Sequence, residues 1–374
     1  MSIAALSLLA CGPDFDPYWQ VDKFRVLAIE SDPITLEEGG SAELRALIHN
    51  PGGEQVEYQW EWCPFETSAQ DRYECPIEPD ELGETSGGGA PEFPDDFFEL
   101  GDDEVAEFDY PGTEEGIGQL CEELASAAEE AEEENEEFAG QFPDLDCASG
   151  YPVSVRMKAS AGDEEIVARK RVTLATGEDT IINHNPALDG FEIRLDKPSD
   201  ADKVREELDW VADLDEDDDW HEVPEDEVVP IAADIPFRIR SLVDPDTVEE
   251  WEPPAPQGSD RERLDPETEV ITFRWFVSAG TVADTQLYYR EERDELEEAG
   301  ETVLNVDYGS EEGDFDEDGV ANRDDNCPMI PNPDQRDEND DGVGDRCDVH
   351  LWSVVRDNRG GLDFLERRVR VVEW

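Results

Sequence analysis

Positive charge is what this sequence has least of. Of its 374 residues, 28 are lysine or arginine and 102 are aspartate or glutamate, and the net charge is −74. A surface with this excess of negative charge repels phosphate groups, and binding to a phosphate backbone would require clustered basic side chains. The composition therefore excludes nucleic acid and anionic lipid surfaces as natural partners.

Known catalytic motifs are also lacking. The sequence contains no G-x-S-x-G, no H-E-x-x-H, no P-loop and no dinucleotide fingerprint. Acidic residues occur throughout, so no carboxylate pair can be singled out for glycoside hydrolysis. The four histidines are scattered, and none has a partner at metal-ligand spacing: His49, His184, His221 and His350. We therefore expect a protein that is not an enzyme.

Long apolar runs are missing too. No run beyond the N-terminus approaches the roughly 18 residues of a membrane-spanning helix. The N-terminus reads MSIAALSLLACGPD, and its LLAC resembles a bacterial lipobox, in which Cys11 becomes the lipidated first residue. Gly12 rather than Asp follows this cysteine, which favours the outer membrane. We expect a lipoprotein-type signal over residues 1–11, a tether over residues 12–23, and membrane contact only through the lipid anchor.

Six cysteines remain when Cys11 is set aside, and none of them forms a C-x-x-C pair. An even number of cysteines without the spacing of a metal site predicts disulfides formed in an oxidising compartment. Many pairings are possible, and the sequence alone does not choose among them. Our hypothesis is that each cysteine pairs locally: Cys63 with Cys75, Cys121 with Cys147, and Cys327 with Cys347.

Short runs of alternating polar and apolar residues begin at residue 24. Turn sequences such as DP at 32–33 and NPG at 50–52 separate them. Trp60 has the position of the buried tryptophan in strand C of an immunoglobulin domain. The alternation predicts strands at residues 24–30, 42–48, 56–62, 153–159, 166–174, 191–195 and 237–243.

The second half of the chain repeats the first. VEYQWEW (56–62) is echoed by ITFRWFV (271–277), and the strand pair at 153–174 is echoed at 349–372. The expected fold is therefore mainly β, with two Ig-like β-sandwich domains at residues 24–177 and 186–374. Each domain carries an acidic, cysteine-containing insert after its tryptophan strand. These inserts span residues 64–150, with a helix at 114–138, and residues 314–348.

Residues 314–348 contain the same pattern twice. Counted from Asp314 and from Asp337, oxygen-bearing side chains recur at positions 1, 3, 5, 9 and 12, with glycine at position 6. This is the ligand spacing of a loop that wraps a hard cation, with a backbone carbonyl at position 7. An EF-hand fits poorly, because position 12 is Asp rather than Glu and Pro328 stands where a helix would begin.

With DNCP, NPDQ and DGVGDRCD, the stretch resembles a thrombospondin type 3 repeat. The resemblance implies an extracellular protein whose disulfide-linked loops bind Ca²⁺ and form little regular secondary structure. The alternative is a solvated acidic loop, but acidity alone does not place glycine and valine in register twice. The implied ligands are Asp314, Asp316, Asp318, Val320, Asn322 and Asp325, then Asp337, Asn339, Asp341, Val343, Asp345 and Asp348.

These observations predict a calcium-binding cell-envelope protein, secreted or lipid-anchored, with a structural or adhesive role and an extracellular protein or glycan as its partner. One alternative is a glycan-binding module, for which Tyr288, Tyr289 and Trp251 are the candidate aromatic residues. The other is an accessory domain of an extracellular hydrolase.

Overall fold

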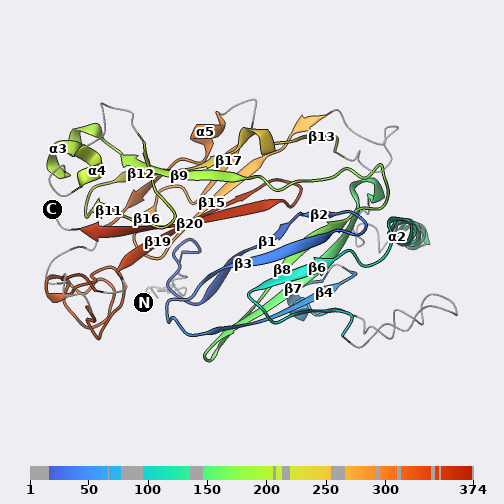
Figure 1. Ribbon diagram of the computed structural model, residues 1–374, viewed down its shortest axis with the longest axis horizontal. Helices are drawn as coiled ribbons and strands as arrows, with labels where there is room; N and C mark the ends of the chain where they lie inside the picture. Colours follow the sequence, from blue (N-terminus) through green and yellow to red (C-terminus); the bar gives the residue numbers. More distant parts are fainter. Residues whose placement is uncertain are drawn as a thin grey trace, which may run out of the picture.

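The computed structural model of the chain is mainly β, with several sheets and three disulfides (Figure 1). The residues that it describes are 17–65, 67–76, 96–134, 146–204, 208–212, 220–253, 266–290, 295–307, 309, 313–337, 342–344 and 347–372. The predicted signal, with Cys11, lies outside the described residues.

The first half of the chain forms two sheets around one apolar core. Across the smaller sheet the order is β1 (Arg25–Asp32), β3 (Ser41–His49) and β6 (Val105–Asp109). Across the larger sheet the order is β2 (Thr35–Leu36), β8 (Glu164–Leu174), β7 (Tyr151–Ala161), β4 (Val56–Cys63) and β5 (Glu99–Gly101). Alternate side chains of both sheets are buried together in one cluster, as expected for two packed sheets.

The second half also forms two sheets that share a core. One contains, in order, β10 (His221–Glu222), β9 (Leu188–Leu195), β12 (Phe237–Val243), β18 (Thr302–Asn305) and β16 (Thr281–Val282). The other contains β11 (Val228–Ala232), β20 (Leu362–Val372), β19 (Asp348–Arg356), β15 (Ile271–Val277) and β17 (Gln286–Tyr289).

The two halves follow the same plan. The order β2-β8-β7-β4-β5 in the first half corresponds to β11-β20-β19-β15-β17 in the second. In both, a short strand pairs in parallel with the last long strand, and the other pairs are antiparallel. Trp60 and Trp275 occupy equivalent places, fully buried, and each donates its indole N–H to a backbone carbonyl, of Asp103 (3.0 Å) and Gly300 (3.1 Å). The internal repeat seen in the sequence is therefore present in the fold.

Few helices accompany the sheets in the part of the chain that the structure describes. The α-helices are α2 (Glu114–Glu134), α3 (Ala201–Val204), α4 (Asp209–Ala212) and α5 (Leu296–Ala299). Short 3-10 helices lie at Ala69–Asp71, Cys147–Ser149, Pro198–Asp200, Pro245–Thr247 and Asn322–Asp324. A small ribbon joins β13 (Glu250–Trp251) to β14 (Glu267–Thr268). None of the described helices is long and apolar enough to cross a membrane.

The halves meet in a third apolar cluster. Leu27 and Leu47 of the first half pack there with Phe276, Trp352 and Leu362 of the second. Polar contacts border this cluster. They include hydrogen bonds from Lys170 Nζ to the carbonyl of Gly360 (2.9 Å) and from Asn185 Nδ2 to the carbonyl of Ser31 (2.8 Å). In Figure 1 the β1–β3 ribbon accordingly runs beneath β20.

The structure differs from the sequence-based expectation in the acidic region at residues 64–150. Within it, β5 pairs with β4 and β6 pairs with β3, so both strands complete the sheets of the first half. The predicted helix begins at Glu114 as expected, and its helical structure is described as far as Glu134. The disulfides join Cys63 to Cys75, Cys121 to Cys147, and Cys327 to Cys347, which are the pairs of the local-pairing hypothesis.

Candidate metal centre

The aspartate-rich segment leaves the second half before β19 and folds as compact loops, drawn in orange at one end of the molecule (Figure 1). Both predicted loops turn at their glycine. Gly319 has a φ of 97° and Gly342 a φ of 86°, values that favour glycine because it has no Cβ. Each glycine N–H donates to the first aspartate of its loop, Gly319 to Asp314 (3.1 Å) and Gly342 to Asp337 (2.9 Å). The two loops therefore make the same turn at glycine and the same hydrogen bond from that glycine to their first aspartate.

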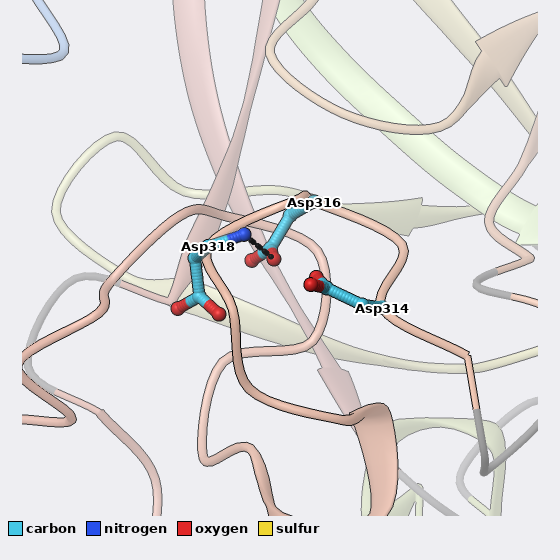
Figure 2. Close-up of side chains that lie close together, drawn as sticks. All are labelled: Asp314, Asp316 and Asp318. Atoms are coloured by element: carbon cyan, nitrogen blue, oxygen red, sulfur yellow. Dashed lines mark hydrogen bonds between the residues drawn. The ribbon is translucent and has the colours of Figure 1, made fainter.

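The first loop gathers three carboxylates. Asp314, Asp316 and Asp318 each place an oxygen within 4.8 Å of the others. Figure 2 shows these side chains inside one turn of the chain, where the Asp318 N–H donates to Asp316 (3.2 Å). Carboxylate oxygens at this spacing are the ligands that Ca²⁺ prefers.

Two carboxylate oxygens of this loop are buried without any hydrogen-bond partner, Oδ2 of Asp316 and Oδ2 of Asp325. The other oxygen of each residue is used, since Asp316 accepts from Asp318 and Asp325 accepts from the N–H of Cys327 (2.8 Å). A buried polar atom without a partner costs free energy, and an ionised carboxylate costs more than a neutral group. A cation bound among the three clustered carboxylates would satisfy the free oxygen of Asp316, so the donor set fits Ca²⁺.

The electrostatics of Asp316 are consistent with that fit. The pKa of Asp316 is raised to about 6, chiefly by burial; the hydrogen bond from the Asp318 N–H opposes the rise, and the charges of Asp318, Asp325 and Asp314 contribute to it. These charges repel one another in the metal-free loop. A divalent cation among them would turn this repulsion into attraction.

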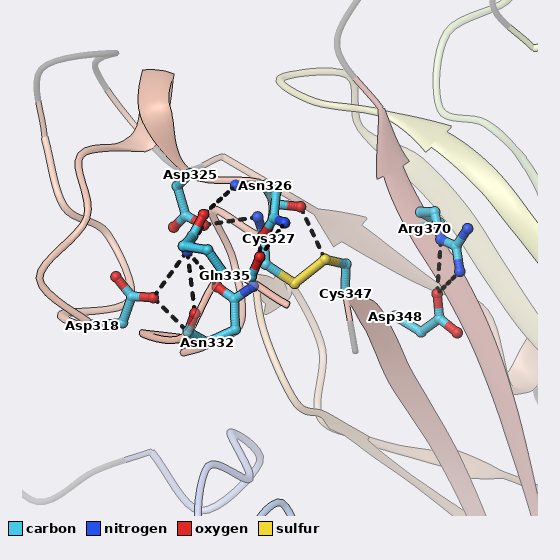
Figure 3. The surroundings of a disulfide bond; sticks show 9 residues. All are labelled: Asp318, Asp325, Asn326, Cys327, Asn332, Gln335, Cys347, Asp348 and Arg370. Atoms are coloured by element: carbon cyan, nitrogen blue, oxygen red, sulfur yellow. Dashed lines mark hydrogen bonds and ion pairs between the residues drawn. A yellow bond between two sulfur atoms is a disulfide. The ribbon is translucent and has the colours of Figure 1, made fainter. Parts of the chain in front are cut away.

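Residues outside the predicted ligand set hold these aspartates in place (Figure 3). Asp318 Oδ2 accepts the backbone N–H of Asn332 (3.0 Å), and Gln335 Nε2 donates to Asp325 Oδ1 (2.7 Å). Neither Asn332 nor Gln335 belongs to the predicted ligand set. Both lie in the NPDQ stretch, which was the available signal.

The segment is fixed to the second half at two points. Cys327 is buried and bonded to Cys347, which directly precedes β19. Met329, only 5 % exposed, joins the core of the second half, and Ile330 packs beside it. The loops are therefore attached to the sheet by a covalent bond and by buried apolar contacts.

The other predicted ligands have different surroundings. Asn322 is buried, and its Oδ1 accepts the N–H of Phe315 (3.0 Å). Val320 donates its N–H to Asp318 Oδ1 (2.8 Å), and its carbonyl remains a predicted ligand. Asp348 lies in β19 and forms an ion pair with Arg370 (2.8 Å), the residue opposite it on β20 (Figure 3). Asn339, Asp341 and Asp345 lie outside the described residues, as does half of the second loop.

A comparison with known families supports the assignment of the first loop. Residues 312–335 match the thrombospondin type 3 repeat family. Repeats of this family bind calcium, and together with the disulfides the match indicates an extracellular or secreted protein. The matched residues include Asp314, Asp316, Asp318 and Asp325, and also Gln335.

The other comparisons are with individual proteins. No curated protein matches the sequence. Among solved structures, three N-terminal domains of the Hoc capsid protein of bacteriophage RB49 align at 8 % identity and a TM-score of 0.17, over 94 % of this chain and 70 % of that one. Escherichia coli alpha-2-macroglobulin aligns at 8 % identity and a TM-score of 0.21, over 96 % and 35 %. TM-scores this low do not support an argument about fold.

Proposed function

We propose that this chain is a calcium-binding protein of the cell envelope, secreted or lipid-anchored, with a structural or adhesive role and without enzymatic activity. The observation that carries the proposal is the pair of buried, unpartnered carboxylate oxygens on Asp316 and Asp325. They lie in the segment that matches a calcium-binding repeat. Three disulfides support a location outside the cytoplasm.

In the first site, Asp314, Asp316, Asp318 and Asp325 would hold the ion, with Asn322 and the carbonyl of Val320 as neutral ligands. Bound Ca²⁺ would neutralise the carboxylates and fix the loop around them. Asp318 would bind the ion and the N–H of Asn332 at once, which couples the ion to the next stretch of chain. The second site would use Asp337, Asn339, Asp341, Val343 and Asp345. We leave Asp348 out of it because its carboxylate pairs with Arg370.

The aspartate-rich segment lies beside the junction of the two halves, where a rigid segment could have a structural role. A cavity of about 580 Å³ lies where the two halves meet, and its lining includes His49 and Pro51 of the first half and His350 of the second. Ile330 and Pro331 of the aspartate-rich segment line the same cavity. A segment ordered by Ca²⁺ would thus fix one wall of the cavity at the junction, which supports a structural role.

The halves themselves fit the proposed Ig-like sandwich. Each has two packed sheets and a buried tryptophan on an inner strand, Trp60 on β4 and Trp275 on β15. Such domains commonly present loops at their ends for contact with partners. The adhesive role rests on this analogy of fold.

The alternative of an extended glycan-binding surface has less support. Tyr288 is 51 % exposed, but Tyr289 is partly buried against the core and Trp251 packs under the guanidinium of Arg359 (5.3 Å). These three rings therefore do not form an exposed row.

Limited proteolysis with and without a chelator tests the calcium proposal. We expect chelation to open cleavage within residues 314–348, because the loop carboxylates then repel one another, while the β signal in circular dichroism persists. Mg²⁺ should protect poorly, because it requires a smaller, octahedral site. An identical cleavage pattern with and without chelator would overturn the proposal.

A further inference from the structure

Five polar side chains share the outer face of three neighbouring strands in the second half, and we call them the arginine patch. Arg356 on β19 lies opposite Thr272 on β15, which lies opposite Tyr288 on β17. In the next row, Arg274 on β15 lies opposite Gln286 on β17. The side chains between these positions on β15 and β19, such as Phe273 and Val355, point into the core. On the same face, Val354 of β19 and Phe276 of β15 pack against the first half. The patch therefore faces away from the core of the second half and lies beside the junction of the two halves.

The two arginines of the patch have no partners. Within the part of the chain that the structure describes, neither Arg274 nor Arg356 forms an ion pair, and the Nε of each is buried without a hydrogen bond. Elsewhere in this half, Arg359 pairs with Glu249 (2.9 Å) and Arg370 with Asp348. Unpaired arginines are unexpected in a chain with 102 acidic and 28 basic residues.

The arginines also repel each other. They are diagonal neighbours on paired strands, a separation of about 7–8 Å between backbones that long side chains span easily. Burial lowers the pKa of Arg356, and the charge of Arg274 lowers it further. Two like charges placed together without a counter-ion reduce stability. A bound anion would remove this penalty.

We propose that the arginine patch binds the carboxylate of an acidic sugar of the uronic acid class. Guanidinium groups bind carboxylates through paired, charge-assisted hydrogen bonds, and two of them can converge on one anion. The ring of Tyr288, 51 % exposed and in the same row as Arg356, offers an apolar face for a sugar ring. The hydroxyl of Thr272 is a polar group suited to a sugar hydroxyl. The amide of Gln286 donates to the hydroxyl of Tyr288 and so helps to hold that ring in place.

The net charge of −74 limits the size of the ligand. A polyanion would be repelled by the rest of the surface, whereas a single carboxylate meets mainly the local field of the two arginines. A sugar with one acidic group therefore fits better than a highly charged polymer or an acidic peptide. The patch contains no residue of the aspartate-rich segment, so the proposal is independent of calcium.

Isothermal titration of the full chain with D-galacturonate tests the proposal, with galactose, acetate and a glutamate-rich peptide as comparison ligands. We expect saturable binding of galacturonate and no binding of galactose. Arg274→Gln and Arg356→Gln should each weaken binding tenfold or more, and Tyr288→Ala should weaken it severalfold. Arg72→Gln is the matched control, because Arg72 is an exposed arginine of the first half that pairs with Glu165.

Thermal melting separates loss of a site from loss of the fold. Arg356→Gln relieves repulsion from Arg274, so its melting temperature should equal or exceed that of the wild type. A lower melting temperature would indicate a structural role and overturn the proposal. So would absence of saturable binding, equal affinity for acetate, tighter binding of the peptide, or unchanged binding in both arginine variants.

Discussion

Asp318 Oδ2 accepts the backbone N–H of Asn332 at 3.0 Å, which joins the first aspartate loop to a residue 14 positions further along the chain. Asn332 directly follows Ile330 and Pro331, which line the cavity between the two halves. One hydrogen bond thus connects the Asp318 carboxylate, proposed to bind Ca²⁺, to the residue that follows the cavity lining at the junction of the two halves. Order at the metal site and order at the junction are therefore expected to depend on each other.

The disulfide between Cys327 and Cys347 should strengthen calcium binding. The two cysteines are 20 residues apart in the sequence, and the chain between them contains most of the second loop. In the chain-entropy account, a disulfide across such a length stabilises the folded state by about 3 kcal/mol. Replacing both cysteines with serine should weaken calcium binding and lower the melting temperature. The control is the same change at Cys63 and Cys75, in the first half, which should leave calcium affinity unchanged. Equal calcium affinity in both double variants would contradict the expectation.

Gly319 should be intolerant of a side chain. Its φ of 97° is unfavourable for other residues, although no atom lies within 4 Å of the place a Cβ would occupy. Gly319→Ala should therefore cost about 1–2 kcal/mol through the backbone alone, and reduce calcium affinity by about tenfold. Gly177→Ala, at a site with equal space and no positive φ, is the control and should have little effect. Calorimetric calcium titration of both variants provides the comparison.

The strands were largely predictable from sequence, because burial on one face leaves an alternating pattern. The predicted strand at residues 237–243 has the bounds of β12, and both tryptophan strands were located. The short strands were missed, among them β11, β17 and β18 in the second half. In the first half β5 and β6 were missed, since they are short and lie in a region rich in Pro, Gly and acidic residues. Their place in the sheets depends on pairing with β4 and β3, which local composition does not reveal.

The candidate site was only partly predictable. Spacing identified Asp314, Asp316 and Asp318, which the structure brings together. Spacing alone did not reveal that Asp348 begins a strand, where the register places it opposite Arg370. Nor did it reveal that Met329 is buried in the core of the second half. Both depend on contacts between segments that are distant in sequence.

The junction should depend on Trp352, which is 1 % exposed and packs edge-on against His49 of the first half (ring centroids 4.9 Å apart). Trp352→Ala removes this contact and leaves a cavity, at a cost of about 3–5 kcal/mol. We expect scanning calorimetry to show a lower melting temperature and separate melting of the two halves. Val105→Ala, at a residue 45 % exposed on β6, should change little. A single transition at the wild-type temperature in Trp352→Ala would contradict this account of the junction.

Glu269 should make stability fall as pH rises. Its pKa is raised to about 7, chiefly by burial and also by the nearby charge of Asp357, although Arg359 lies at 3.1 Å and opposes the rise. The folded state thus holds a proton that the unfolded state, with a pKa near 4.5, releases. Stability contributed by the protonated group is complete below about pH 4.5 and is lost as pH rises through about 7.

Comparison with Glu269→Gln isolates this effect from the charge of the whole chain. The wild type should lose stability relative to the variant between pH 4.5 and 7, by a few kcal/mol in order of magnitude. Glu267→Gln, at an exposed residue on β14, should show no such trend. Chemical unfolding across this range measures the difference, and a constant difference would contradict the assignment.

Calorimetric titration of the full chain with CaCl₂ tests the calcium site most directly. We expect saturable binding with a dissociation constant of about 10⁻⁴–10⁻³ M, the range of extracellular calcium modules. Asp316→Asn should weaken the first site by tenfold or more, whereas Asp102→Asn, at an exposed acidic residue of the first half, should not. Absence of saturable binding, or equal affinity in both variants, would contradict the assignment of calcium to this loop.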